Sequence, residues 1–230
     1  MAFMRSFFHV AWIVVKKDLT IEVRSREILD TTLFFAVSCV LVFAVAFVRE
    51  GRALTEAAAG ILWITVAFAG TLALGRTFER ERHSETLRAL MMAPADRPAV
   101  YVGKLLGILA LLAAIELIVL PLVALLFQAP FFTRPLLMGL LLAAGTVGFC
   151  AVGTLFAAML VRARSRDVLL PILLYPITIP VIIAGVRGTL ALLQEVPDVA
   201  MARFWITLLV FFDVVFVTLS LWTFEPLMTE

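Results

Sequence analysis

Six long apolar runs dominate the chain, and short charged segments separate them. A helix that crosses the hydrocarbon core of a bilayer needs about 20 mostly apolar residues, and lipid offers no hydrogen-bond partner to an exposed backbone. The pattern is therefore typical of membrane-spanning helices, and not of a membrane β-barrel, whose strands alternate apolar and polar residues. We predict six spans, at residues 28–48, 57–75, 105–127, 136–161, 168–186 and 204–224.

The composition indicates that lipid is the solvent. Of the 230 residues, 63% are hydrophobic and 16% are charged, and the mean hydropathy is +1.08. A soluble domain is about 45–50% apolar and about 25% charged, and a soluble globule of this length could not bury so much apolar surface. The composition excludes a disordered chain, a nucleic-acid-binding protein and a secreted disulfide scaffold. Because no repeat or linker divides the chain, we expect a single all-α domain over residues 1–230.

Positively charged residues predict the orientation of the chain. Fourteen of the 19 Lys and Arg residues fall in segments 1–27, 76–104 and 162–166, and five fall in the segments on the other side of the predicted spans. Lys and Arg are enriched in the cytoplasmic loops of membrane proteins. We therefore expect these three segments and both termini in the cytoplasm.

Residues 5–27 have the pattern of a helix that lies in the membrane interface. Such a helix buries its apolar face among the lipids and keeps its basic residues near the headgroups. Asp18 and Glu22 interrupt the apolar face, so the lipid-facing stripe ends near Val15. The last turns then either contact a partner or simply anchor the first span. The apolar face is formed by Phe7, Phe8, Ala11, Val14 and Val15.

The segment 76–104 is the longest charged stretch of the chain. No residue before Pro94 breaks a helix, and proline ends one because it lacks the backbone donor and restricts the residue before it. Leu87, Leu90 and Met91 form an apolar patch at helical spacing, surrounded by charges. This arrangement fits a docking surface for a soluble partner. The alternative is an ordinary positively charged loop beside a span.

Two carboxyl groups, Glu116 and Asp213, lie well inside the predicted spans. An ionisable residue at the centre of a span costs about 2.5–3.5 kcal/mol on insertion scales and usually faces protein or water. The pair therefore indicates either a substrate path or gating residues, or a satisfied contact between helices.

The fifth span contains three prolines, Pro171, Pro176 and Pro180. Each proline removes a backbone donor and leaves carbonyl groups that need other partners. We expect this span to be bent and to lie inside the bundle. It is a candidate for a moving or substrate-lining element, with a static kink as the alternative.

Several motifs of catalytic and ligand-binding sites are absent from the sequence. It contains no P-loop, no H-E-x-x-H zinc motif, no Cys-x-x-Cys pair and no nucleophile elbow. We therefore predict a chain that is not an enzyme, does not bind ATP itself, and holds no metal or cofactor.

Three stretches resemble a known family: GILWITVAFAGTLALGRTFERE, LRALMMAPADRPAVYVGK and LLPILLYPITIPVIIAG. With the six spans and the N-terminal helix, they resemble the permease subunits of ABC-2-type transporters, and more closely the haem exporter B family (CcmB) of cytochrome c maturation. The resemblance implies an ABC-2-type permease fold in the bacterial inner membrane. It also implies permease dimers and three partners: a separate ATPase that binds ATP and Mg²⁺ (CcmA), a haem-handling membrane protein (CcmC) and a small single-span subunit (CcmD).

The resemblance also assigns a role to the charged segment. Residues 78–92 correspond to the family's coupling helix, which docks on the ATPase, so haem export or the release of a haem-loaded chaperone would be linked to ATP hydrolysis. The alternatives are a permease that exports a lipid, polysaccharide or drug, and a scaffold for the haem-handling subunit that transports nothing. The implied docking residues are Glu79, Arg80, Glu85, Leu87, Arg88, Leu90 and Met91.

Overall fold

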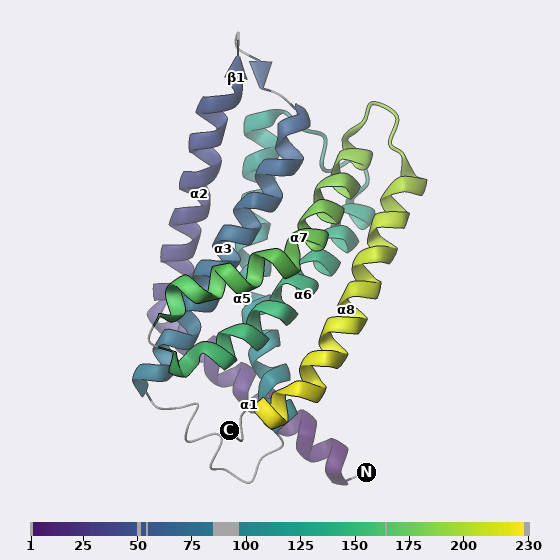
Figure 1. Cartoon of the computed structure of the whole chain (residues 1–230). Helices are drawn as coiled ribbons and strands as arrows, with labels where there is room; N and C mark the ends of the chain where they lie inside the picture. The colour runs from purple at the N-terminus through teal and green to yellow at the C-terminus, as the bar shows by residue number, and fades with distance from the viewer. Residues whose placement is uncertain (1, 50–51, 54, 85–96, 164, 228–230) are drawn as a thin grey trace.

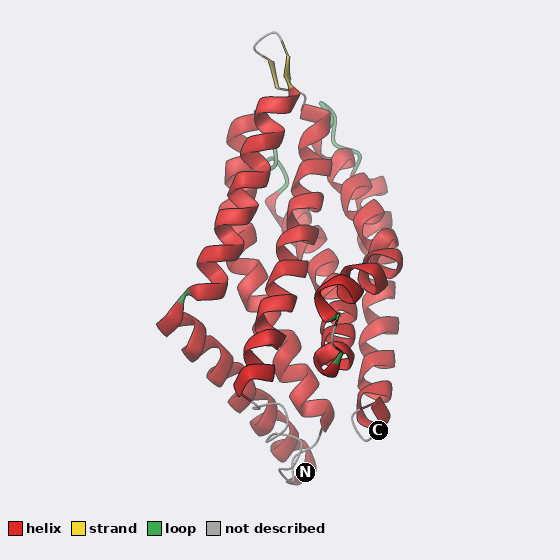
Figure 2. Cartoon of the chain, turned by 60° about the vertical axis from the view of Figure 1, so that its left-hand side comes forward, coloured by secondary structure: helices red, strands yellow, loops and turns green. Residues whose placement is uncertain are grey.

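Seven long helices make up most of the computed structural model, which describes residues 2–49, 52–53, 55–84, 97–163 and 165–227. Apart from α1, each is long and apolar enough to cross a membrane, which confirms the all-α, polytopic fold class. A two-residue antiparallel ladder, β1 (Val48–Arg49) with β2 (Arg52–Ala53), joins α2 to α3 (Figure 2). The helices are α1 (Ala2–Ser25), α2 (Glu27–Phe47), α3 (Thr55–Ser84), α5 (Arg97–Phe127), α6 (Pro135–Met159), the short η1 (Leu160–Arg162), α7 (Arg166–Leu193) and α8 (Val199–Leu227).

The six spanning helices form one bundle, and α1 crosses obliquely at one end of it (Figure 1). The start of α1 and the end of α8 lie at this same end, as an even number of spans requires, and the β1–β2 ladder lies at the other. We call the first of these the α1 end of the bundle. A single cluster of buried apolar residues contains side chains from all six spans.

Three of the helices run further than their apolar runs. Helix α3 continues through Ser84, α5 already begins at Arg97, and α7 continues to Leu193. Charged residues end a hydrophobic run without ending a helix, because the backbone ladder needs no apolar side chain. Residues 85–92 of the predicted coupling helix lie outside the described residues.

Helix α1 packs against protein with the face that we predicted to lie among lipids. Ala11, Val14 and Val15 are buried, but Phe8 of the same predicted face is exposed, as is Trp12. The prediction that lipid covers this face is therefore wrong for Ala11, Val14 and Val15. Gly103 allows the close approach of α5, since a Cβ atom at that position would lie 2.7 Å from the Cβ of Val14.

Helix α7 is bent, and the direction of the bend follows from where its prolines lie. Figure 1 shows its first part running obliquely across the bundle and its later part following the bundle axis. Pro176 and Pro180 are exposed and Pro171 is half-buried, so the prediction that this span lies inside the bundle is wrong for its proline side. Prolines on the outer side bend a helix toward the opposite face, and α7 therefore curves over its neighbours.

Candidate functional site

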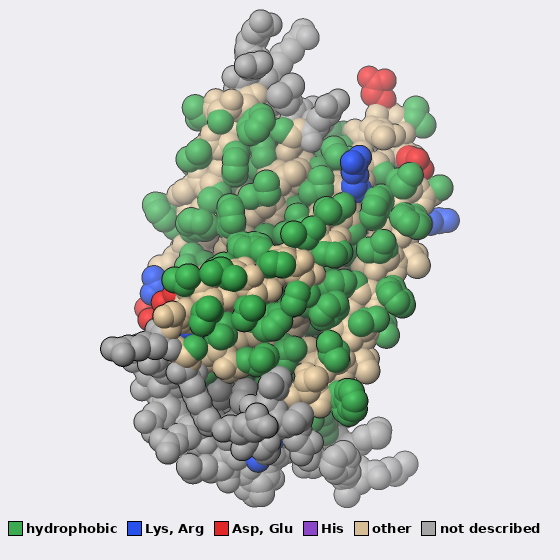
Figure 3. All heavy atoms as spheres, in the orientation of Figure 1, with side chains coloured by type: hydrophobic (Ala, Val, Ile, Leu, Met, Phe, Trp, Pro, Cys, Tyr) green, Lys and Arg blue, Asp and Glu red, His purple; other side chains and the backbone are tan. Residues whose placement is uncertain are grey.

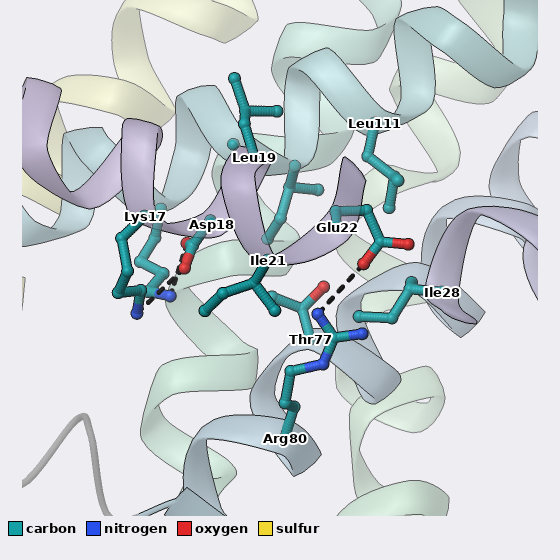
Figure 4. Close-up of a pocket in the computed structure, with 12 residues that line it drawn as sticks. Lys17, Asp18, Leu19, Ile21, Glu22, Ile28, Thr77, Arg80 and Leu111 are labelled. Carbon is teal, nitrogen blue, oxygen red and sulfur yellow. Dashed lines mark hydrogen bonds and ion pairs between the residues drawn. The ribbon is translucent and has the colours of Figure 1, made fainter. Parts of the chain in front are cut away.

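A cavity of about 300 Å³ lies between α1, α3 and α5 at the α1 end of the bundle (Figure 4). Apolar side chains of α1, α2 and α5 line part of it, and charged residues from α1, α3 and α5 also line it. We call these charged residues and their contacts the joint. They are Lys17, Asp18 and Glu22 of α1, Arg80 of α3 and Lys104 of α5.

The first contact of the joint ties α1 to α5. The Nζ atom of Lys104 lies 2.6 Å from Oδ2 of Asp18, and the Lys104 side chain is only 2% exposed. Lys17 approaches the other carboxylate oxygen at 3.0 Å. Hydrogen bonds between charged groups are short and strong, and a buried ammonium needs such a partner because burying an isolated charge is very costly.

The second contact ties α1 to α2 and α3. One carboxylate oxygen of Glu22 accepts the backbone N–H of Leu29 at 2.7 Å, near the start of α2. The other accepts a hydrogen bond from Nη1 of Arg80 at 3.1 Å. Arg80 also reaches Ser25 Oγ at 3.3 Å and a Glu27 oxygen at 3.9 Å. Glu22 therefore holds three helices together at one point.

The joint explains why α1 has carboxylates on its apolar face. Asp18 and Glu22 are one helical turn apart, and they face Lys104 and Arg80, which belong to the bundle. The last turns of α1 contact α2, α3 and α5 of the same chain, and contact of these turns with a partner stays a prediction. In the sequence, the positions of Asp18 and Glu22 on the apolar face indicated that these residues contact other polar groups. Lys104 is the residue of the joint that the sequence pattern did not identify.

The structure describes two of the seven predicted docking residues. Arg80 belongs to the joint, and the Glu79 carboxylate lies 3.8 Å from the Arg76 guanidinium on the same helix. The others, Glu85, Leu87, Arg88, Leu90 and Met91, lie outside the described residues.

The two intramembrane carboxyl groups have separate surroundings. Thr146 of α6 donates a hydrogen bond to Glu116, which is buried on α5. Asp213 of α8 lies against Gly148 of α6, and its Oδ1 atom is buried without a hydrogen-bond partner in the described part of the chain. Positions 146 and 148 project about 200° apart around a helix, so α6 separates the two carboxyl groups. Neither residue lines the joint cavity, and their role in gating or transport stays a prediction.

The charged groups of the joint can connect helices mechanically. The joint contains carboxylates, ammonium groups and one guanidinium, all engaged with one another. Within the described ranges, no three His, Cys, Asp or Glu side chains lie close enough to hold a metal ion. The arrangement can carry a displacement of the end of α3 into α1 and α5.

The sequence matches a family model described as CcmB protein, over residues 9–226. Several relatives are named heme exporter protein B. The one from Rhodobacter capsulatus is 30% identical over 194 residues, which cover 80% of this chain and 86% of that protein. The one from Paracoccus denitrificans is 31% identical, covering 75% and 78%, and the one from Pseudomonas aeruginosa is 28% identical, covering 76% and 78%.

Proposed function

Because the chain belongs to the CcmB family, we propose that it is the permease subunit of an ATP-driven complex that serves cytochrome c maturation. The family match and the six spanning helices support this proposal. A separate CcmA-like subunit binds ATP and Mg²⁺, and CcmC-like and CcmD-like membrane subunits complete the complex with a second permease copy. The α1 end of the bundle faces the cytoplasm of a bacterial cell, and the complex lies in the inner membrane.

The observation that carries the proposal is the joint at the base of the predicted coupling segment. Helix α3 continues beyond its apolar run through Ser84, directly before residues 85–92. Arg80, one turn before that end, is tied to α1 through Glu22. Asp18 in turn ties α1 to α5 through the buried Lys104. A force applied at the end of α3 therefore reaches two other helices through charged contacts.

In this mechanism, ATP closes two ATPase subunits on each other and displaces the coupling segments. The joint moves α1 and the base of α3 together, and the bent α7 supplies a helix that can change its curvature. A change driven by a ligand requires contacts that differ between the two states. We propose that Glu116, Asp213 and the prolines of α7 belong to the part of the bundle that differs.

The charge reversal Arg80→Glu tests the joint. It places a third carboxylate beside Glu22 and Glu27, and the loss of a charged hydrogen bond costs about 1.5–3 kcal/mol. We expect a lower melting temperature in detergent, and less ATPase co-purified with the chain. The double variant Glu22→Arg/Arg80→Glu should restore the ion pair, and with it part of both, but not the Leu29 contact, because arginine has no acceptor. Arg24→Glu, at an exposed position on α1, should change neither.

A second reversal, Arg88→Glu, tests ATPase docking separately from the joint. We expect it to reduce ATPase co-purification and cytochrome c maturation while leaving the melting temperature of the isolated chain unchanged. If the ATPase still co-purifies and cytochrome c still matures in both Arg80→Glu and Arg88→Glu, the docking assignment is wrong.

Alanine at both Glu116 and Asp213 tests the intramembrane carboxyl groups. We expect the complex to assemble while cytochrome c maturation falls, because the variant removes both polar groups from the proposed moving region. Normal maturation in this variant would exclude a role for either group in gating or transport.

A further inference from the structure

A second cavity, of about 450 Å³, forms a groove between α2, α3 and α7. It is lined by Phe35 of α2, by residues from segment 68–79 of α3 and by residues from segment 167–175 of α7. We call it the lateral groove. The side of the bundle shown in Figure 3 is covered mostly by hydrophobic side chains, with acidic and basic side chains together at its left edge and others at the upper right. A groove on an apolar membrane-spanning surface is filled either by lipid or by another helix.

The lining of the lateral groove changes in a fixed order along α3. Phe68 is followed one turn later by the hydroxyl group of Thr71, and then by the charges of Arg76 and Glu79. These positions span about 16 Å at 1.5 Å per residue. The phenol oxygen of Tyr175 accepts a hydrogen bond from Thr71 at 3.2 Å, so α7 adds a second hydroxyl at the same level. The order of aromatic, hydroxyl and charged groups matches the acyl chains, ester region and headgroup of a phospholipid.

The charges at the end of the groove are of both signs. Arg76 and Glu79 line it together with Asp167, and the carboxylate of Asp167 is 86% exposed. Beside them lies the buried guanidinium of Arg166, which donates from Nη2 to the Gly75 carbonyl at 2.6 Å and lies 3.8 Å from Asp167. Its Nε and Nη1 atoms have no hydrogen-bond partner among the described residues. The groove itself is lined by one cation and two anions, which can pair with both charges of a zwitterionic headgroup, whereas an anionic headgroup would meet two carboxylates.

We propose that the lateral groove binds phosphatidylethanolamine from the leaflet at the α1 end. The phosphate faces Arg76, and the ammonium group, which has N–H donors, faces the Glu79 and Asp167 carboxylates. A choline headgroup carries the same charge but cannot donate these hydrogen bonds. The proposal holds whatever substrate the complex transports, so it can fail without affecting the proposed function.

Lipid retention in the purified chain tests the proposal. The probes are phosphatidylethanolamine, phosphatidylcholine and phosphatidylglycerol, added at equal concentration in mild detergent, and bound lipid is counted by native mass spectrometry. We expect phosphatidylethanolamine to bind about fivefold more tightly than the others, because phosphatidylcholine loses a hydrogen bond to a carboxylate and phosphatidylglycerol loses the ammonium charge. Equal binding of the three lipids would overturn the proposal, since it indicates ordinary boundary lipid.

Two variants locate the site. Gly75→Leu puts a side chain into the groove, where a Cβ atom meets nothing within 4 Å, and Gly60→Leu on the same helix is an equally open control. We expect bound phosphatidylethanolamine to fall at least fivefold in the first and to stay unchanged in the second, with equal melting temperatures in the absence of lipid. If Gly75→Leu instead loses a co-purifying membrane subunit and retains its lipid, the groove binds a partner helix and the proposal is wrong.

Headgroup recognition is tested without changing the shape of the groove. Glu79→Gln/Asp167→Asn removes the two carboxylates, and Glu195→Gln, exposed at the other end of α7, is the control. The double variant should bind phosphatidylethanolamine and phosphatidylcholine equally, whereas the control should keep the fivefold preference. A preference that survives in the double variant contradicts the assigned headgroup contacts.

Discussion

Replacement of Gly145 by leucine is expected to leave almost no folded protein. A Cβ atom at this position of α6 would overlap the ring of Trp63, which is 2% exposed. The ring cannot shift freely, because its N–H donates to Thr189 Oγ1 at 2.9 Å and Gly185 of α7 also packs against the ring. Overpacking costs about 1–3 kcal/mol or more, and a displaced ring would also leave a buried donor unpaired, at about 1–3 kcal/mol.

The yield of monodisperse protein in size-exclusion chromatography, with the melting temperature in detergent, measures this effect. Gly139→Leu is the matched control, because it lies on the same helix and a Cβ atom there meets nothing within 4 Å. The control should behave as the wild type does. Similar yields and melting temperatures for the two variants would show that Trp63 is not held between α6 and α7 as the structure has it.

The second large effect is expected from Asp18→Asn, which should release α1 from the bundle. The variant removes the carboxylate that lies 2.6 Å from the buried ammonium of Lys104. Removal of one partner of a buried ion pair costs about 3–5 kcal/mol, because the other charge remains in a poorly solvated site. We expect a lower melting temperature and faster proteolytic cleavage between α1 and α2.

Two companion variants separate this buried pair from general charge effects. Lys104→Met/Asp18→Asn removes both charges and should recover much of the lost stability, since a buried ion pair can often be replaced by uncharged groups. Lys17→Met changes the outer contact, in which the lysine side chain is 29% exposed, and should cost less than about 1 kcal/mol. If the double variant is as unstable as Asp18→Asn, the burial of an uncompensated charge is not the cause.

Much of the fold could be predicted because the bilayer acts on each apolar run separately. A run of about 20 apolar residues must form a helix in lipid whatever its neighbours do, so six spans, the all-α class and the family followed from local patterns. The predicted helix ends were less accurate. The segment after Gly185 continues α7 to Leu193 and is largely buried, although Arg187 ends the apolar run in the sequence.

The candidate site could be predicted only in part, because its contacts join residues far apart in the chain. Arg80 was selected for its place in a charged segment, but its partner Glu22 is 58 residues away. Lys104 and Asp18 are 86 residues apart, and neither was recognised as part of a pair. Glu116 and Asp213 were correctly placed within spans, but the sequence could not show that α6 lies between them.

The amino-acid sequence by itself determined which segments enter the membrane, because hydropathy and backbone hydrogen bonding depend on neighbouring residues. Which faces of these helices meet was decided by the tertiary structure. Between helices in lipid, all faces are apolar and hydrophobicity does not distinguish them, so packing of small residues and polar contacts sets the arrangement. Gly145 against Trp63, Gly103 against Val14 and Lys104 against Asp18 are such contacts. Each contact depends on how two helices are rotated about their own axes relative to each other. No local sequence pattern specifies this orientation.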